Sequence, residues 1–534
     1  SVCFAVSVVK LSARKTLVRD LYCVETLARV DTLCLDKTGT ITEGTMQVDE
    51  LIPFEGVTQQ EMDAALNGLV SNLQDGNPTF QAIQERYPQP SPWRAGTLVP
   101  FSSARKWSGA FFPGRGAFVM GAGEFILGEG FSAIREQVEG YSQQGQRVLL
   151  LAQSQEDFDG QALPGQLRLL GLVLISDKIR REAPRTLRYF ADQGVDLKVI
   201  SGDNAVTVAN IARKAGLEHA DKYVDATTLR TEEDIRRAVN EYSVFGRVTP
   251  QQKLSFVKAL KAQGHTVAMT GDGVNDAPAL KQADIGVAMG ITGTEVSKDA
   301  SSMILTDDNF ATIVKAVENG RNLYKNIKYA IQFLLSGNFG AILAVLCASL
   351  AGLPVPFAPV HLLFINLLTD SLPAIALGVE PHSSEVMNEK PRSADESILT
   401  KDFLGKIGLE GFVIGGMTMI GFLTGYHQNG ALLGSTYAFG TLCLARLFHG
   451  FNCKSDHPVI FTKRFFNNKW LQGAFALGAV LITVVLTVPG FHLLFKVETL
   501  DLMQLGCVYL YAFASLPIIQ LLKWVRMKLR KRGE

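Results

Sequence analysis

The polarity of the chain changes abruptly near residue 322. Before this point polar and apolar residues are mixed as in a soluble protein, whereas long apolar runs dominate afterwards. Most of these runs have close to the roughly 20 residues that an α-helix needs to cross a bilayer. The sequence therefore predicts a soluble part followed by about six transmembrane helices, at 329–352, 355–379, 411–426, 431–451, 470–491 and 503–524.

Basic residues are concentrated in alternate loops of the apolar part. They follow the second and the fourth run and fill the C-terminal segment, whereas only Lys496 interrupts the other loops. Basic residues favour the cytoplasmic side of a membrane. We therefore expect a multi-pass protein of the cell (plasma) membrane, with its soluble part and its C-terminus in the cytoplasm.

Length, charge and cysteine content exclude several other classes of protein. A chain of 534 residues needs more than one core. Its 52 Lys and Arg residues nearly balance its 51 Asp and Glu residues, so no nucleic-acid partner is indicated. The seven cysteines show no CxxC spacing. We interpret them as buried thiols and expect neither a zinc site nor a disulfide framework.

Three strand-like runs in the soluble part end in acidic loops that contain glycine. The loops begin at Asp36, at Ser201 and at Gly271, and helical patterns separate the runs. In a doubly wound parallel sheet such loops meet at one edge, because ligands bind outside the carboxyl ends of the strands. We therefore expect the three segments to form one site.

The residue types at this edge suit phosphoryl transfer. A carboxylate such as Asp36 can attack a phosphoryl group and hold it as an aspartyl phosphate. Lys37 and Lys253 can neutralise the charge that spreads over the transferred group. Asp272 and Asp276 can hold Mg²⁺, a hard ion that takes oxygen ligands from carboxylates and phosphate.

The residues around Asp36 also indicate what happens to the phosphoenzyme. Ser201, Gly202 and Thr38 offer hydroxyl and backbone donors. Thr38 lies two residues after the nucleophile, where a phosphatase of this architecture would carry an acid to protonate the leaving group and activate water. Threonine can do neither. The sequence therefore predicts a lasting phosphoenzyme and disfavours a membrane-tethered phosphatase.

Four motifs and the six apolar runs together resemble the P-type (E1-E2) cation-transporting ATPases over essentially the whole chain. The motifs are DKTGTIT, SGDN, ISDKIRREAP and GDGVNDAPAL. The resemblance implies that Asp36 is phosphorylated from ATP. It assigns Mg²⁺ binding to Asp36, Thr38, Asp272 and Asp276, and nucleotide binding near the hinge to Asp177, Arg180, Ser201, Gly202 and Asp203.

The resemblance also implies a fold and a domain order. A multi-domain α/β part would contain a doubly wound parallel-sheet, haloacid dehalogenase-like phosphorylation domain with an inserted α+β nucleotide-binding domain, and an all-α membrane domain would follow. The expected ranges are 1–25 for the end of a fourth transmembrane helix and stalk, 26–48 and 166–322 for the two parts of the phosphorylation domain and a stalk, 49–165 for the nucleotide-binding domain, 323–526 for transmembrane helices five to ten, and 527–534 for a basic tail.

Within the expected nucleotide-binding domain, two residues match family positions. Phe101 resembles the aromatic residue that stacks on adenine, with a core position as the alternative, and Arg147 resembles a phosphate-contacting arginine. Where the family usually has Lys-Gly-Ala, this chain has Met120 in place of the lysine. We expect Arg105 or Lys106 to supply the missing cation.

Polar residues in the second apolar run indicate a cation site. Asn366, Thr369 and Asp370 stand at i, i+3 and i+4, hence on one face of a regular helix. A carboxylate in a membrane segment is a functional candidate by default. Pro373 removes a backbone donor and can expose a carbonyl. Such oxygen ligands suit a hard cation such as Ca²⁺, and the alternative is hydrogen bonding between helices.

The same run is similar to the sixth helix of calcium-transporting P-type ATPases, and Asn338 matches a ligand of their fifth helix. Two-site calcium pumps have acids where this chain has Ala341 and Arg446. The resemblance therefore implies a one-site calcium pump in which Arg446 pairs with Asp370 as a counter-charge. The alternative for Arg446 is a position at the membrane interface, and Mn²⁺, Na⁺ or H⁺ remain alternative ions.

A further alternative concerns the extent of the chain. It resembles a longer protein that is cut inside its fourth transmembrane helix, so the actuator domain and the first helices of the family lie outside it. A catalytically incomplete fragment, or a regulatory subunit that binds nucleotide or a partner, is therefore a second hypothesis. The sequence leaves the oligomeric state open.

Overall fold

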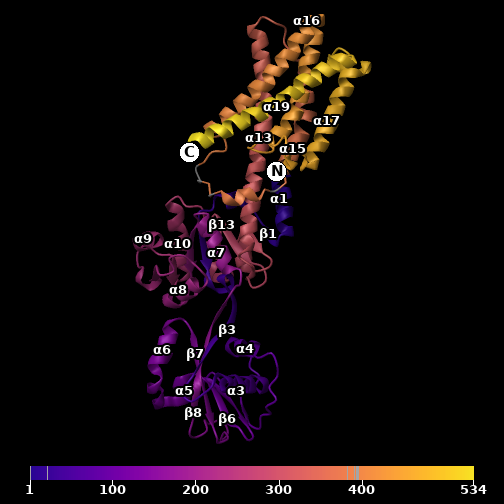
Figure 1. Cartoon of the computed structure of the whole chain (residues 1–534). Helices are drawn as coiled ribbons and strands as arrows, with labels where there is room; N and C mark the ends of the chain where they lie inside the picture. The colour runs from indigo at the N-terminus through magenta and orange to yellow at the C-terminus, as the bar shows by residue number, and fades with distance from the viewer. Residues whose placement is uncertain (1, 21, 382, 390, 393–395, 534) are drawn as a thin grey trace. The chain divides into compact units, whose positions relative to one another are not determined.

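A computed structural model describes residues 2–20, 22–381, 383–389, 391–392 and 396–533 of the chain (Figure 1). The chain divides into two compact units. The first, here called the soluble unit, is Arg14–Lys315. The second, the helical unit, combines Ser1–Ala13 with Ala316–Glu534.

An eight-stranded sheet forms the centre of one half of the soluble unit. Its strand order is β1-β14-β13-β12-β2-β9-β11-β10, and all neighbours are parallel except β1 and β14. The strands are β1 Thr16–Val18, β2 Thr32–Asp36, β9 Asp196–Ile200, β10 Tyr223–Asp225, β11 Val244–Gly246, β12 Val267–Gly271, β13 Ile285–Met289 and β14 Met303–Leu305. The prediction of a doubly wound parallel sheet is confirmed, and the antiparallel edge strand β1 is an addition to it.

Strand β2 lies between β9 and β12, and this order brings the predicted loops together. Every residue of β2 is buried, as expected for a central parallel strand. Asp36 pairs with Ile200 at the end of β9, and Cys34 pairs with Met269 of β12. The three strands therefore end at the same edge of the sheet, and the predicted convergence of their loops is confirmed.

Helices between these strands pack on the sheet and position residues at its edge. Helix α10 begins with a capping box, in which Thr249 Oγ1 accepts from the Gln252 N–H and Gln252 Oε1 accepts from the Thr249 N–H. This start places Lys253 in the first turn. The helices are α2 Cys23–Thr26, α7 Ala183–Asp192, α8 Ala205–Lys214, α9 Glu232–Glu241, α10 Pro250–Ala262, α11 Ala277–Gln282 and α12 Glu295–Ala300.

A second, antiparallel sheet lies between the two parts of the parallel sheet in the sequence. Its order is β3-β8-β7-β6-β5-β4. The strands are β3 Thr42–Pro53, β4 Leu98–Val99, β5 Trp107–Phe112, β6 Gly116–Gly121, β7 Arg147–Ser154 and β8 Arg168–Ile179, and the helices are α3 Gln59–Asn72, α4 Pro78–Arg86, α5 Gly123–Leu127 and α6 Arg135–Gln143. The long pair β3 and β8 begins directly after the Asp36 loop and ends directly before Arg180.

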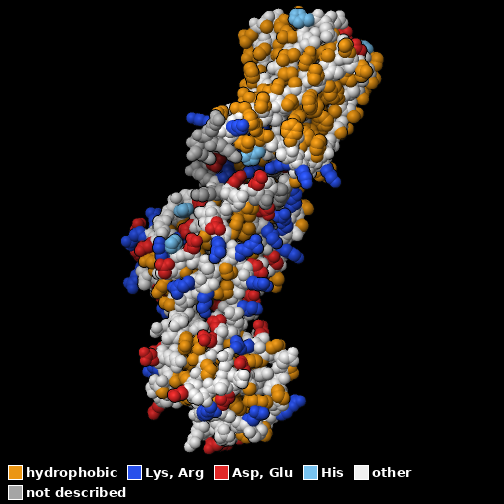
Figure 2. Space-filling view, viewed as in Figure 1, with side chains coloured by type: hydrophobic (Ala, Val, Ile, Leu, Met, Phe, Trp, Pro, Cys, Tyr) orange, Lys and Arg blue, Asp and Glu red, His pale blue; other side chains and the backbone are white. Residues whose placement is uncertain are grey.

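The helical unit contains five helices, among the described residues, that are long and apolar enough to cross a membrane. Its helices are α1 Val2–Ala13, α13 Thr312–Leu350, α14 Pro359–Phe364, α15 Ser371–Gly378, α16 Lys401–Cys453, α17 Lys469–Thr487, α18 His492–Phe495 and α19 Leu502–Gly533, where α14 and α15 belong to one spanning segment. Hydrophobic side chains cover the visible face of this unit in Figure 2. Exposed residues such as Leu363, Phe412 and Trp470 suit contact with lipid.

Helix α16 bends back on itself. Its backbone leaves the helical conformation at Asn429 and Gly430. A Cβ on Gly421 would lie 2.6 Å from Thr441 Oγ1, so the two halves of α16 pack closely against each other. The 53 residues of α16 therefore form two adjacent segments, and the six apolar runs of the sequence correspond to five continuous helical stretches.

Candidate functional site

Asp36 ends β2, where two donors reach its carboxylate and one acceptor holds its backbone N–H. Asp36 Oδ1 accepts from the Lys37 N–H at 2.8 Å, and Oδ2 accepts from Lys253 Nζ at 3.3 Å. The Asp36 N–H in turn donates to Thr270 Oγ1 at 3.0 Å. Asp36 is 8% exposed. The carboxylate is thus held in one orientation at the edge of the sheet.

Three carboxylates and one ammonium group form the centre of the site. Ligand oxygens of Asp36, Asp272 and Asp276 all lie within 4.8 Å of one another. Lys253 Nζ lies 2.6 Å from Asp276 Oδ1 and 3.3 Å from Asp36 Oδ2. One ammonium group therefore faces three carboxylates. When all four groups are ionised, the cluster carries an excess negative charge that a divalent cation can neutralise.

Burial and mutual repulsion raise the pKa values of two of the carboxylates in this cluster. Burial raises the pKa of Asp36 to about 7, and the charges of Asp276 and Asp272 add to this rise while that of Lys253 opposes it. Burial, followed by the charge of Asp276, also raises the pKa of Asp272. A bound Mg²⁺ would relieve this repulsion, so the donor set fits the ion that the sequence predicts there.

The loop after Asp36 needs a glycine at position 39. Gly39 has φ +72°, and a Cβ there would lie 2.5 Å from Asp272 Oδ2. Arg180 holds the same loop, because its guanidinium donates to the carbonyl oxygens of Gly39 and Thr40 at 2.9 and 3.0 Å. In this structure Arg180 thus positions the loop. Thr38, the predicted Mg²⁺ ligand beside it, is exposed.

The side chain of Lys37 points to other partners than expected. Its ammonium forms ion pairs with Asp177 and with Asp203, the latter at 2.6 Å. Burial would lower the pKa of Lys37, but hydrogen bonds to these two carboxylates raise it above its usual value. Only the backbone N–H of Lys37 contacts Asp36. Lys253, and not Lys37, is therefore the ammonium group that neutralises Asp36.

The loop after β9 contributes the buried Ser201 and the exposed Gly202 and Asp203 to the same edge. Ser201 is 3% exposed, and its Oγ accepts from the Asp203 N–H at 3.2 Å. Gly202 has only one atom, the Val248 carbonyl oxygen, near the position of a Cβ. The structure thus places Ser201, Gly202 and Asp203 together, as predicted from the sequence.

A cleft of about 560 Å³ opens on the antiparallel sheet. Four predicted positions line it, namely Phe101, Lys106, Met120 and Arg147. Phe101 is 39% exposed and is therefore not a core residue. Arg147 donates to Thr79 Oγ1. The cleft thus offers an accessible aromatic ring and two cations at the positions expected for nucleotide binding.

Arg105 lies outside the lining of this cleft. Its guanidinium packs over the Trp107 ring, 5.4 Å from the ring centroid, and donates to Gln161 and to the Pro100 carbonyl oxygen. Of the two cations considered as replacements for the lysine missing at Met120, the structure therefore places Lys106 in position and Arg105 elsewhere.

In the helical unit, Asp370 and Arg446 form a buried ion pair. Arg446 Nη2 lies 2.7 Å from Asp370 Oδ2 and donates to Asn338 Oδ1 at 2.8 Å. The two charged side chains are 5% and 1% exposed. Arg446 therefore does not lie at the interface, and the predicted pairing with Asp370 is present. Gly337 makes room for it, because a Cβ there would lie 2.8 Å from Arg446 Cζ.

The backbone before Asp370 is not a regular α-helix. The Asp370 N–H donates to the Ile365 carbonyl oxygen, five residues back, at 2.9 Å, and this wide turn of the π-helical type spans Ile365–Thr369. Thr369 and Asp370 are buried, whereas Asn366 is exposed. The expectation that these three residues share one face does not hold for Asn366, because the extra residue in the turn rotates it away.

Sequence reasoning missed the groups that support these sites. Thr270 and Gly39 fix the Asp36 loop, and Gly337 accommodates Arg446. A glycine inside a helix, such as Gly337 between Ser336 and Asn338, gives no signal of what packs against it. Gly39 could have been singled out, since the left-handed conformation that it adopts is typical of glycine in a tight loop.

Known protein families match residues in both the soluble unit and the helical unit. Residues 30–284 and 252–317 match the model of the haloacid dehalogenase-like hydrolases, and residues 354–525 match that of the cation transporting ATPase C-terminus. The calcium-transporting ATPase 1 of Bacillus cereus is 34% identical to this chain over 593 residues, covering 98% of the chain and 66% of that protein.

Two further relatives match shorter parts of both chains. The calcium-transporting ATPase of Bacillus subtilis is 43% identical over 334 residues, 62% of this chain and 37% of its own length. Calcium-transporting ATPase CtpE of Mycobacterium tuberculosis is 40% identical over 80% of this chain and 54% of its own length. The chain thus spans up to about two thirds of these relatives. From the family matches, the relatives and the arrangement of both units, the chain belongs to the P-type cation-transporting ATPases.

Proposed function

We propose that the protein that contains this chain couples ATP hydrolysis to the transport of Ca²⁺ through an aspartyl phosphate at Asp36. The observation that carries this proposal is the oriented Asp36 carboxylate beside Lys253 and the Asp272 and Asp276 pair. The names of the relatives support the choice of Ca²⁺. The soluble unit would lie in the cytoplasm and the helical unit in the cell membrane, as the basic loops predict.

Phosphorylation needs a nucleophile, an orientation and charge neutralisation. A carboxylate oxygen of Asp36 forms a bond to the γ-phosphorus of ATP, the bond to the bridging oxygen breaks, and ADP leaves. The Lys37 N–H orients the carboxylate, and Thr270 Oγ1 holds the Asp36 backbone by accepting from its N–H. Lys253 balances the growing negative charge. Mg²⁺, held by Asp36, Asp272 and Asp276, would supply further charge neutralisation.

Binding of ATP would use the cleft on the antiparallel sheet. Phe101 offers an exposed ring on which a base can stack, and Lys106 and Arg147 offer cations for the phosphates. Asp177 and Asp203, which are both assigned to nucleotide binding, form ion pairs with Lys37 of the phosphorylation loop.

The ion pair in the helical unit provides the proposed transport site. Asp370 Oδ1 is buried without a hydrogen-bond partner among the described residues. Pro373 has no N–H, so the Thr369 carbonyl lacks its regular helical donor. These oxygen atoms suit Ca²⁺. Arg446 neutralises Asp370 when the ion is absent and would move aside when it binds, because two cations cannot share one carboxylate cheaply.

The substitution Asp36→Asn in the complete pump tests the proposal. The amide keeps the shape of the side chain but is a far weaker nucleophile, so acid-stable phosphorylation from radiolabelled ATP should disappear while nucleotide binding remains. Asp221→Asn, at an exposed position of the same unit, is the control and should be phosphorylated normally. Full labelling of the Asp36→Asn protein would refute the assignment.

A further inference from the structure

A second group of metal-ligating side chains lies in the helical unit. Glu410 belongs to the first half of α16, and His449 and Cys453 belong to the second half. One ligand atom from each of the three lies within 4.8 Å of the other two. All three residues are buried, with exposed fractions of 3%, 0% and 0%. Neither phosphorylation at Asp36 nor the ion pair at Asp370 uses this cluster.

The ligand atoms of the cluster lie at or close to the separations found around a tetrahedral metal ion. His449 Nε2 lies 3.1 Å from Cys453 Sγ and 3.5 Å from Glu410 Oε2, and it also contacts Ser336 Oγ at 2.7 Å. An imidazole nitrogen offers one hydrogen or one lone pair, so it cannot satisfy three partners. Ligands of a tetrahedral Zn²⁺ lie about 3.3–3.8 Å apart, given Zn–N and Zn–S bonds of about 2.0 and 2.3 Å.

The imidazole ring of His449 is buried and packs against an aromatic neighbour. His449 Nδ1 is buried and has no partner among the residues that the structure describes. The ring packs nearly parallel to Phe333, with 6.4 Å between the centroids. Nε2 is the ring nitrogen that faces Cys453 and Glu410.

The orientation of Glu410 is also fixed from outside the cluster. The Gln332 amide on α13 donates to Glu410 Oε1 at 2.9 Å and to Oε2 at 2.7 Å. Hydrogen bonds of this kind typically orient carboxylates that bind metals. A thiolate and a carboxylate together balance the charge of a divalent cation, so the complete complex would be neutral and therefore tolerable in a buried position.

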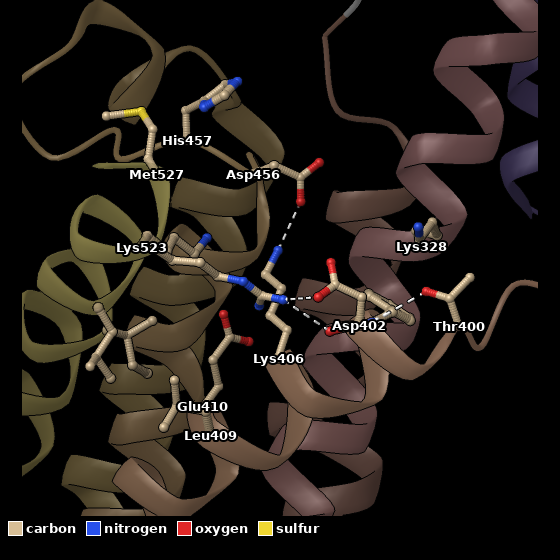
Figure 3. A pocket seen from close by; sticks show the side chains of 14 residues that line it. Lys328, Thr400, Asp402, Lys406, Leu409, Glu410, Asp456, His457, Lys523 and Met527 are labelled. Atoms are coloured by element: carbon tan, nitrogen blue, oxygen red, sulfur yellow. Dashed lines mark hydrogen bonds and ion pairs between the residues drawn. The ribbon is translucent and has the colours of Figure 1, made fainter. Parts of the chain in front are cut away.

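A pocket of about 400 Å³ reaches this cluster. Figure 3 shows Glu410 at its wall, near Lys406 and Lys523. Both lysines have acceptors of their own: Lys406 Nζ lies 2.8 Å from Asp456 Oδ1, and Lys523 Nζ donates to the Ser455 carbonyl oxygen at 2.7 Å. Glu410 is therefore not committed to an ion pair with either lysine, and the pocket gives an ion a route to its carboxylate.

We propose that Glu410, His449 and Cys453 form a binding site for a thiophilic divalent cation, with Zn²⁺ as the ion of matching chemistry. The site is separate from the proposed Ca²⁺ site and does not depend on the proposed function. A bound ion would tie the two halves of α16 together. Sequence spacing cannot reveal such a site, because its ligands stand 39 and 43 residues apart from Glu410 along the chain, which explains why the cysteines alone indicated none.

Cobalt substitution provides the test, because a cysteine thiolate bound to Co²⁺ gives a charge-transfer band in the near ultraviolet. The purified complete pump, with Mg²⁺ in excess to saturate the acidic cluster of the soluble unit, is titrated with Co²⁺ and then with Zn²⁺. We expect the band to appear with one equivalent of Co²⁺ and to disappear when Zn²⁺ displaces it. A wild-type pump without this band would overturn the proposal, whether or not any variant folds.

Variants then assign the ligands. Cys453→Ser should abolish the band, and Glu410→Gln should retain it with an affinity at least about tenfold lower. Cys347→Ser removes an exposed cysteine of α13 and is the matched control, which should behave like the wild type. An unchanged band in Cys453→Ser, or unchanged affinity in Glu410→Gln, would contradict the assigned ligand set.

Discussion

At the scale of single residues, the two lysines near Asp36 have different partners, although both were predicted to neutralise the transferred phosphoryl group. Lys253 contacts Asp36 and Asp276, whereas Lys37 pairs with Asp177 and Asp203. Residue type and position in the sequence predict that a cation is near the nucleophile. They do not predict the direction of a long side chain, which depends on carboxylates contributed by other segments of the chain.

Replacement of Lys253 should therefore slow phosphorylation strongly. Lys253→Met leaves three carboxylates without their cation, and we expect a loss of at least about tenfold in the rate of phosphorylation, since charge-stabilising groups typically contribute this much or more. Lys258→Met changes an exposed lysine of the same helix and should phosphorylate at the normal rate. Rapid-quench labelling with ATP measures both. Equal rates for the two variants would contradict the role of Lys253.

The neighbouring cations Arg105 and Lys106 provide a second comparison. Lys106 lines the cleft and Arg105 does not, so Lys106→Gln should weaken ATP binding about tenfold, as expected for the loss of one charged hydrogen bond. Arg105→Gln should leave the affinity within about twofold. Calorimetric titration of the complete pump with a non-hydrolysable ATP analogue measures both. A stronger effect of Arg105→Gln would show that the cleft is not the nucleotide site.

At the scale of elements, the parallel sheet was the most predictable part of the fold. The runs before Asp36, Ser201 and Asp272 are apolar and end in glycine-containing loops, and this pattern alone placed three segments at one edge. The turn before Asp370 was not predictable in this way. Hydropathy indicates a helix, but it does not distinguish a π-type turn, with a hydrogen bond to the residue five positions back, from a regular α-helical turn. Asn366 was therefore assigned to the wrong face.

The contact between α13 and the second half of α16 depends on the small size of Gly337. A Cβ at this position would come within 2.7 Å of Arg446 Nη2, and Arg446 is held there by Asp370 and Asn338. Gly337→Ala should therefore disturb the ion pair and lower the thermal midpoint of unfolding, because overpacking typically costs about 1–3 kcal/mol.

A glycine with free space around it supplies the control for this prediction. Nothing lies within 4 Å of a Cβ at Gly416 in α16, so Gly416→Ala should keep or raise the midpoint through its better helix propensity. The unfolding of both detergent-solubilised variants is followed by circular dichroism. If Gly337→Ala were as stable as Gly416→Ala and bound Ca²⁺ normally, Arg446 would have more freedom than the packing indicates.

At the scale of the whole molecule, the proposed phosphorylation site lies in the soluble unit and the proposed cation site lies in the helical unit. The sequence predicted both sites from separate signals, the acidic loops and the polar residues in an apolar run. It could not predict the buried ion pair from residue type alone, since Arg446 could also have reached the interface. The resemblance to the family supplied that pairing, and the contact of 2.7 Å agrees with it.

The central claim is that one Ca²⁺ bound beside Asp370 accompanies each phosphorylation of Asp36. The most direct measurement counts radioactive calcium bound to the complete pump against the maximal level of acid-stable phosphoenzyme, with Mn²⁺, Na⁺ and H⁺ compared as activating ions. We predict one Ca²⁺ per phosphorylation site, and phosphorylation that requires Ca²⁺. Two Ca²⁺ per site, or full phosphorylation that depends on another ion and not on Ca²⁺, would contradict the account.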